Sequence, residues 1–87
     1  MKHKMEYFEG GELELVLVAT KLKQALAAEE VLDKEGIEYG IEVDQFRGGF
    51  LGLSNRTGVF FYALVGQAEY CRGVLQKNGY KPNPAPK

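Results

Sequence analysis

The residues best suited to chemistry lie in one stretch rich in glycine and arginine, DQFRGGFLGLSNRTG, at positions 44–58. Arginine offers a planar set of N–H donors that fits phosphate and carboxylate groups. Glycine and asparagine adopt left-handed turns, which present backbone N–H groups to an anion. The stretch therefore predicts an anion-binding loop, whose candidate ligand-binding residues are Arg47, Gly48, Gly49, Asn55, Arg56 and Thr57.

The same stretch has an interpretation that involves no ligand. It is long for a hairpin connection in a small domain, and long connections are often functional or disordered. GGFLG does not have the spacing of a phosphate-binding P-loop. A hairpin whose apolar side chains pack on the sheet or on a neighbouring chain explains the composition equally well; those residues are Phe46, Phe50, Leu51 and Leu53.

The other reactive side chains do not assemble into a catalytic site. Cys71 falls on the apolar side of a predicted helix, where a thiol acts as a small apolar group. His3 is the only histidine and lies in the N-terminal segment, so a histidine-based triad or zinc site lacks partners. Glu29 is expected at the edge of a helix face, and Glu38 and Glu42 on a solvated strand face. We therefore predict no catalytic residue, no metal site, no cofactor and no enzymatic activity.

The aromatic run Phe60, Phe61 and Tyr62 introduces an RNA-binding module as a further alternative. RNA-recognition domains carry aromatic residues on their third strand, in the pattern K/R-G-F/Y-G/A-F-V-x-F/Y. RTGVFFYA departs from that pattern at most of its positions, and the strand LVLVAT contains no aromatic residue. Core packing and an oligomer interface are simpler roles for these side chains.

The composition is that of one small globular domain. The chain has 87 residues, of which 45% are hydrophobic and 26% charged, and a formal net charge of −1. This charge does not supply the positive field of a general nucleic-acid binder. A single cysteine cannot form an intrachain disulfide and favours a reducing compartment, and no apolar run reaches the ~20 residues of a membrane span. We expect a cytoplasmic protein without a membrane partner.

The sequence nearly repeats itself when it is aligned with itself so that Gly36 matches Gly79. Two similar structural units are therefore expected to position the candidate residues. VLDKEGI at 31–37 then falls on VLQKNGY at 74–80, which indicates duplicated supersecondary units. Apolar patterning predicts strands at 13–19, 37–43 and 59–65. Helical spacing predicts a helix that follows an N-cap at Thr20 and a second helix at 67–78, each ended by one of the two glycines.

This β-α-β-β-α order predicts an α+β fold, a ferredoxin-like sandwich in which an antiparallel sheet packs against two helices. The fourth strand of that fold would fall in YKPNPAP, where alternating prolines cannot sustain strand pairing, so we expect it to be short or missing. Its loss leaves 13–19 as an open apolar edge. We expect either a homo-oligomer, a dimer or trimer, or a fold-back of the segment from Met5 to Phe8 onto that edge.

Over roughly residues 13–80, the chain resembles the PII-like (GlnB-like) group of small signal-transducing proteins, most of all its short, uncharacterised members. The resemblance rests on LVLVAT before an alanine-rich helix, on VLDKEGIEYGIEV, and on the glycine–arginine stretch before the third strand. It implies a ferredoxin-like fold and a trimer in which the base of the long loop helps to form a ligand pocket between subunits. By position it points to Arg47, Gly48, Gly49, Arg56 and Thr57. ATP-binding members carry a phosphate loop rich in glycine and lysine after the second helix, where this chain has KNGYKPNPAPK.

These observations predict a non-catalytic, PII-like regulatory or binding module. It would sense a small anionic metabolite, or contact a partner protein, through loop 44–58. The alternative is an oligomeric interaction or scaffold protein that binds no small molecule. We expect a flexible N-terminal segment at 1–12, the domain at 13–80 and a proline-rich tail at 81–87.

Overall fold

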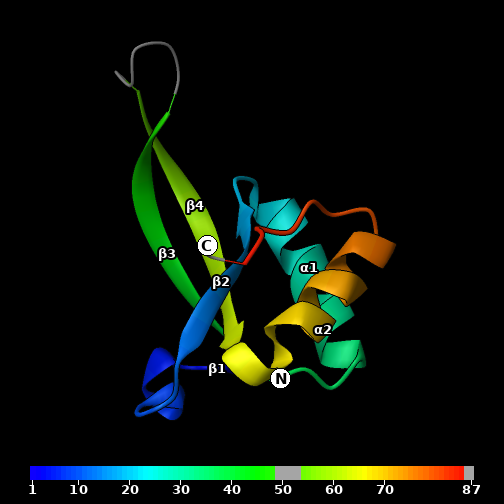
Figure 1. Cartoon of the computed structure of the whole chain (residues 1–87). Coiled ribbons are helices and arrows are strands. Elements are labelled where there is room, and N and C mark those ends of the chain that lie inside the picture. Colours follow the sequence, from blue (N-terminus) through cyan, green and yellow to red (C-terminus); the bar gives the residue numbers. More distant parts are fainter. Residues whose placement is uncertain (49–53, 86–87) are drawn as a thin grey trace.

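The chain forms a four-stranded sheet with two helices on one of its faces (Figure 1). The structure is a computed structural model and describes residues 1–48 and 54–85, with the side chains of 46–48 and 54–56 outside that description. The predicted α+β class is confirmed. In chain order the elements are β1 (Lys2–His3), the short 3-10 helix η1 (Met5–Phe8), β2 (Leu13–Ala19), α1 (Leu22–Lys34), β3 (Tyr39–Gly48), β4 (Ser54–Leu64) and α2 (Val65–Lys77).

The sheet is mixed and has the strand order β1-β3-β4-β2. β4 is antiparallel to both β2 and β3, whereas β1 is parallel to β3. The predicted all-antiparallel sheet is therefore wrong at one edge, because two residues of β1 are too few to produce an alternating pattern. No strand follows α2 as far as Ala85, so the fourth strand of the sequence pattern is missing, as expected.

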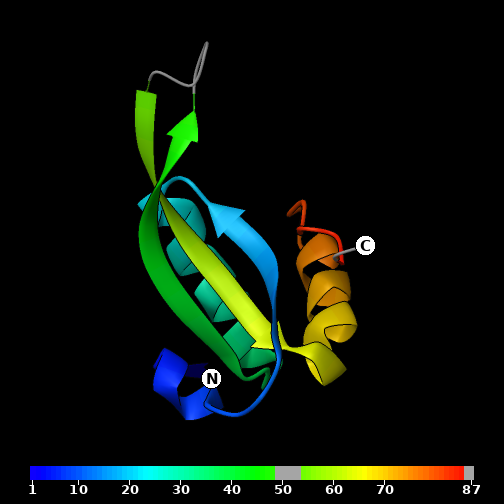
Figure 2. The same cartoon turned by 60° about the vertical axis from the view of Figure 1, so that its left-hand side comes forward.

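The core lies between the sheet and the helices, which cover the same face in both views (Figures 1 and 2). Its largest fully buried side chains are Tyr39 and Phe61, whose ring centroids are 5.9 Å apart. The Tyr39 hydroxyl donates to Oδ1 of Asp33 on α1 at 3.0 Å, so its polar end has a partner. Burial, and then this bond, raise the pKa of Tyr39, which keeps the hydroxyl protonated as a donor.

The two helices end in the same way, as the internal repeat predicts. Gly36 and Gly79 both have positive φ, 68° and 87°. After each glycine, the next N–H donates to a carbonyl in the last helical turn, and an apolar side chain follows the turn. The donor and acceptor pairs are Ile37 to Leu32 at 3.1 Å and Tyr80 to Leu75 at 3.0 Å. The repeat therefore extends to the hydrogen bonds that close each helix.

β3 and β4 are longer than the sequence pattern predicts. Pairing continues beyond Val43 and Val59, from Asp44 opposite Gly58 to Gly48 opposite Ser54. The prediction that 44–58 is a loop is thus wrong at both ends, which form a two-stranded ribbon that projects beyond the helices (Figures 1 and 2). The described side chains Asp44, Gln45 and Thr57 are exposed, and the added residues DQFRG and SNRTG show no apolar alternation that would predict a strand.

The N-terminal segment folds back on the sheet, but on the opposite edge from the one predicted. Lys2 and His3 pair with Tyr39 and Gly40 of β3, not with β2. η1 then covers Gly40, where an added Cβ would lie 2.6 Å from Sδ of Met5. Residues 1–12, for which we expected a flexible segment, thus include both β1 and η1.

The outer edge of β2 is covered in part by the C-terminal tail. The Asn83 N–H donates to the Val16 carbonyl at 2.8 Å. Val16 lies at an irregularity in the pairing of β2 with β4, and such a bulge weakens an edge as a template for other strands. Among residues 1–48 and 54–85, no helix has both the length and the apolar character needed to cross a membrane.

Candidate binding site at the base of the hairpin

The residues predicted to bind a ligand are spread along the β3–β4 ribbon. Arg47 lies opposite Asn55, and Gly48 opposite Ser54. Arg56 pairs with Phe46, and Thr57 with Gln45, so the two arginines occupy different rungs. Gly49 lies outside the described residues. The ribbon thus replaces the expected glycine-rich loop at five of the six positions, and their backbone is extended.

Thr57 is the one predicted site residue whose side chain the structure describes, and it lines a cavity. This cavity, of about 290 Å³, lies where β2 passes into α1 at the base of the ribbon. Thr20 and Lys21 supply its other polar groups. Its apolar wall is formed by Ala19, Leu22, Val43 and Val59.

The N-terminus of α1 gives this cavity a positive character. Its N-cap residue is Lys21, which makes no side-chain capping bond, and its first turn contains no acidic residue. The predicted N-cap at Thr20 is therefore wrong. The first N–H groups of a helix carry partial positive charge, which a capping oxygen or an acidic residue usually balances. Here a lysine occupies that place, so the helix end favours an anion.

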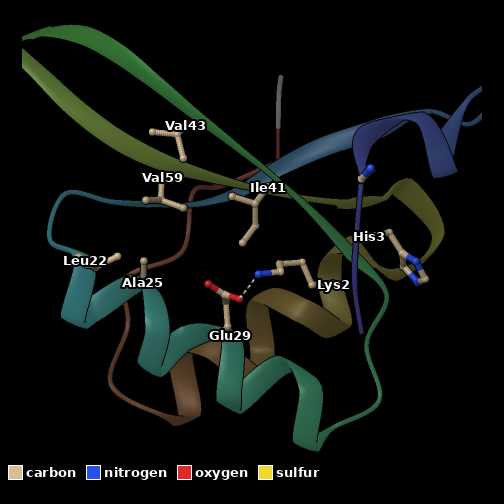
Figure 3. A pocket seen from close by; sticks show the side chains of 9 residues that line it. Lys2, His3, Leu22, Ala25, Glu29, Ile41, Val43 and Val59 are labelled. Carbon is tan, nitrogen blue, oxygen red and sulfur yellow. Dashed lines mark ion pairs between the residues drawn. The ribbon is translucent and has the colours of Figure 1, made fainter.

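A larger groove, of about 430 Å³, continues from this cavity along the edge of β3 (Figure 3). Leu22 and Val43, which line both hollows, are 71% and 68% exposed. At the far end, Lys2 forms an ion pair of 2.9 Å with Glu29 of α1. Only 18% of the Glu29 side chain is exposed, so its expected place at the edge of the helix face is confirmed.

A polar cluster that the sequence did not predict holds the N-terminal segment. The Glu38 carboxylate accepts a hydrogen bond of 2.6 Å from the Tyr7 hydroxyl and lies 3.1 Å from Nε2 of His3. The His3 and Tyr7 rings stack with centroids 3.6 Å apart. Tyr7, and then His3, lower the pKa of Glu38. The only sequence signal was the coincidence of basic residues at the N-terminus with acidic residues near β3.

Arg72 is the only buried charged residue in the described part of the chain. It forms ion pairs with Glu14 of β2 at 2.8 Å and with Glu69 at 2.7 Å. It also donates hydrogen bonds to the Leu15 carbonyl at 3.2 Å and to the Asn83 carbonyl. Burial opposes the charge of Arg72, but the two carboxylates outweigh it and raise its pKa. Because all its partners are structural, we assign Arg72 to the anchoring of the tail on β2.

The remaining reactive groups are inert in this fold. Cys71 is fully buried, and burial raises the pKa of its thiol to about 11, so it stays protonated near neutral pH. In the ranges 1–48 and 54–85, no three histidine, cysteine, aspartate or glutamate side chains form a group that could hold a metal ion.

Comparisons with known proteins return no relative of this chain. No protein-family model matches it, and neither the curated proteins nor the solved structures contain a match.

Proposed function

We propose that the chain is a PII-like, non-catalytic regulatory module that binds a small anionic metabolite at the base of the β3–β4 hairpin. The observation that carries the proposal is the cavity in which Thr57 meets the uncapped N-terminus of α1 and Lys21. Threonine hydroxyls, a lysine and free helical N–H groups are all donors to phosphate or carboxylate oxygens. The cavity volume of about 290 Å³ is that of a small metabolite site.

The topology supports a ferredoxin-like domain as the scaffold of this module. The order β2-α1-β3-β4-α2, with β4 between β2 and β3, is that of a split β-α-β unit. In this arrangement the fourth strand would lie beside β2, where the tail bonds through Asn83. The PII-like resemblance likewise implies a ligand pocket at the base of the long hairpin. Thr57 is one of the residues to which that resemblance points, and it also lines the cavity.

The test is a thermal-unfolding screen of the whole chain with inorganic phosphate, bicarbonate, small dicarboxylic and 2-oxo acids, and adenine nucleotides. A ligand present at about one hundred times its Kd stabilises the folded state by about 2.7 kcal/mol. We expect one class of anion to raise the Tm. Lys21→Ala and Thr57→Val should remove that rise, and the double substitution Arg47→Ala/Arg56→Ala tests whether the ribbon contributes.

Lys77→Ala is the matched control, because Lys77 lies in the last turn of α2, outside the cavity. It removes the same charge and should leave the ligand-induced rise in Tm unchanged. If no anion stabilises the protein, or if all four variants respond alike, the proposal is wrong.

A second candidate is an oligomeric scaffold that binds no small molecule. On the face of the sheet opposite the helices, β2 and β4 carry half-buried apolar side chains, and η1 is the one helix on that face in the described ranges 1–48 and 54–85 (Figure 2). Apolar patches of this kind are typical of association surfaces. The residues of this open face are Leu13, Leu15, Val18, Phe60, Tyr62 and Leu64.

Leu15→Lys and Tyr62→Lys separate this candidate from a monomeric module. Tyr62 lies opposite Leu15 on β2, so either charge falls at the centre of the open face. We expect a dimer or trimer in analytical ultracentrifugation that both variants dissociate. Burial, and then the charges of Glu42 and Asp44, raise the pKa of Tyr62 on this face. The same two carboxylates repel a phosphate backbone, which disfavours RNA binding there.

A further inference from the structure

The outer edge of β3 is only partly occupied by the chain itself. β1 pairs with Tyr39 and Gly40, and the chain then turns away at Lys4 into η1. β3 continues to Gly48. Beyond Gly40 the outer edge therefore has no neighbouring strand among the described residues.

The backbone groups along that free edge are arranged to receive a strand. The Tyr39 N–H donates outward, to the Met1 carbonyl at 3.1 Å. N–H groups alternate in direction along a strand, so the Val43 N–H points the same way. The Gln45 N–H, two residues on, bonds to the neighbouring Asp44 carboxylate at 2.7 Å instead of to another strand. The edge thus offers an unpaired backbone N–H at Val43, whereas the N–H of Gln45 is already bonded to the Asp44 side chain.

The side chains on the two faces of this edge differ in character. On the helix side of the sheet, Ile41, Val43 and Val59 face Leu22 and Ala25 of α1 across the 430 Å³ groove (Figure 3). Lys2, His3 and Lys4 of the N-terminal segment also line one end of it. Glu29 pairs with Lys2, and the His3 ring points away from the groove toward Glu38. On the opposite face, Glu42 and Asp44 are exposed and have no ion-pair partner among the described residues.

We propose that the edge of β3 from Ile41 to Gln45 is a strand-addition site for an extended segment of a partner protein that alternates apolar and basic residues. Side chains of an added strand point alternately to the two faces. Its apolar residues would enter the groove beside Val43, and its basic residues would face Glu42 and Asp44. β1 already docks on the same edge through backbone pairing with Tyr39 and Gly40, with Lys2 on Glu29 and the His3 ring hydrogen-bonded to Glu38. This site adjoins the anion cavity and shares Val43 with it, but Glu42, Asp44 and the free backbone edge lie outside the lining of that cavity.

The test measures fluorescence anisotropy of a labelled synthetic peptide that alternates lysine and valine, titrated with the whole chain. Two control peptides have the same composition in separate lysine and valine blocks, or glutamate in place of lysine. We expect saturable binding of the alternating basic peptide alone. Reversal of charge in Glu42→Lys/Asp44→Lys should weaken it and allow the glutamate peptide to bind.

Two variants test the edge itself. Val43→Pro removes one outward N–H, and proline is tolerated on an edge strand whose N–H faces solvent. Val43→Arg fills the groove with a cation. Each should weaken binding by about tenfold, the effect of one backbone hydrogen bond and its neighbouring contacts. Leu26→Arg is the matched control, because Leu26 is 54% exposed on α1 and lies outside the groove.

Equal binding of the block peptide, or unchanged binding by Val43→Arg, would overturn the proposal. So would an absence of peptide binding together with self-association that Val43→Pro abolishes, since that result assigns the edge to a second copy of the chain. Retained binding in Lys21→Ala separates this site from the anion site.

Discussion

At the scale of single residues, the buried ion pair of Arg72 with Glu14 is the interaction most sensitive to change. Removal of the guanidinium leaves Glu14, only 17% exposed, without its cation. Loss of one partner of a buried pair costs about 3–5 kcal/mol. We expect Arg72→Ala to lower the free energy of unfolding by on the order of 3 kcal/mol in urea denaturation.

Glu69→Ala is the matched control, because it removes the other carboxylate of the same arginine. Glu69 is 81% exposed, and exposed pairs contribute at most about 1 kcal/mol. Similar losses in the two variants would show that burial of the Glu14 pair has no special role. Recovery of stability in Arg72→Met/Glu14→Leu would assign the loss to the unpaired charge.

The Glu38 cluster predicts that docking of the N-terminal segment depends on pH. The Tyr7 bond, followed by His3, lowers the pKa of Glu38 from 4.5. A depressed pKa contributes stability above the ordinary value, which is lost as the pH falls through the lower, folded value. We expect hydrogen exchange at Tyr39, whose N–H bonds to Met1, to accelerate below about pH 4.5. In Glu38→Gln the acceleration of exchange at low pH should disappear. An unchanged pH profile of exchange in this variant would contradict the role of Glu38 in docking the N-terminal segment.

At the scale of elements, glycines with different backbone conformations should respond oppositely to alanine. Gly73 lies inside α2 with no atom within 4 Å of an added Cβ, so Gly73→Ala should stabilise the protein by about 1 kcal/mol. Gly79→Ala also has open space, but φ is +87° there, so it should destabilise by about 1 kcal/mol. Urea denaturation of the two variants measures both changes. Changes of the same sign would show that φ does not govern these positions.

The sequence determined elements with a buried face and missed those without one. The strand at 13–19 and both helix ends follow from apolar spacing and from Gly36 and Gly79, which the repeat located. β1 is too short to show a pattern, and the residues at the ribbon ends of β3 and β4 lack apolar alternation, so the sequence predicted neither. At the candidate site the sequence identified Thr57 but not Lys21. Lys21 contributes because it is the N-cap residue of α1, and the sequence pattern had predicted the N-cap one residue earlier.

At the scale of the whole molecule, a terminal segment of the chain covers part of the edge of β3 and another covers part of the edge of β2. On β3 that segment is β1. On β2 the contact is the Asn83 N–H on the Val16 carbonyl. Asn83→Pro removes that donor, whereas Asn83→Ala keeps it and provides the matched control. We expect Asn83→Pro alone to lose about 1 kcal/mol of stability and to gain concentration-dependent association through the freed edge, measured by light scattering. Equal behaviour of the two variants would show that the tail does not protect β2.

The anion site at the base of the hairpin is tested most directly by an NMR titration of amide resonances with the anion that stabilises the protein most. We predict saturable shifts at Thr57 and at the first residues of α1, Leu22 and Lys23, and we predict their loss in Lys21→Ala. Shifts confined to other surfaces, or shifts at α1 that persist unchanged in Lys21→Ala, would contradict a binding site there.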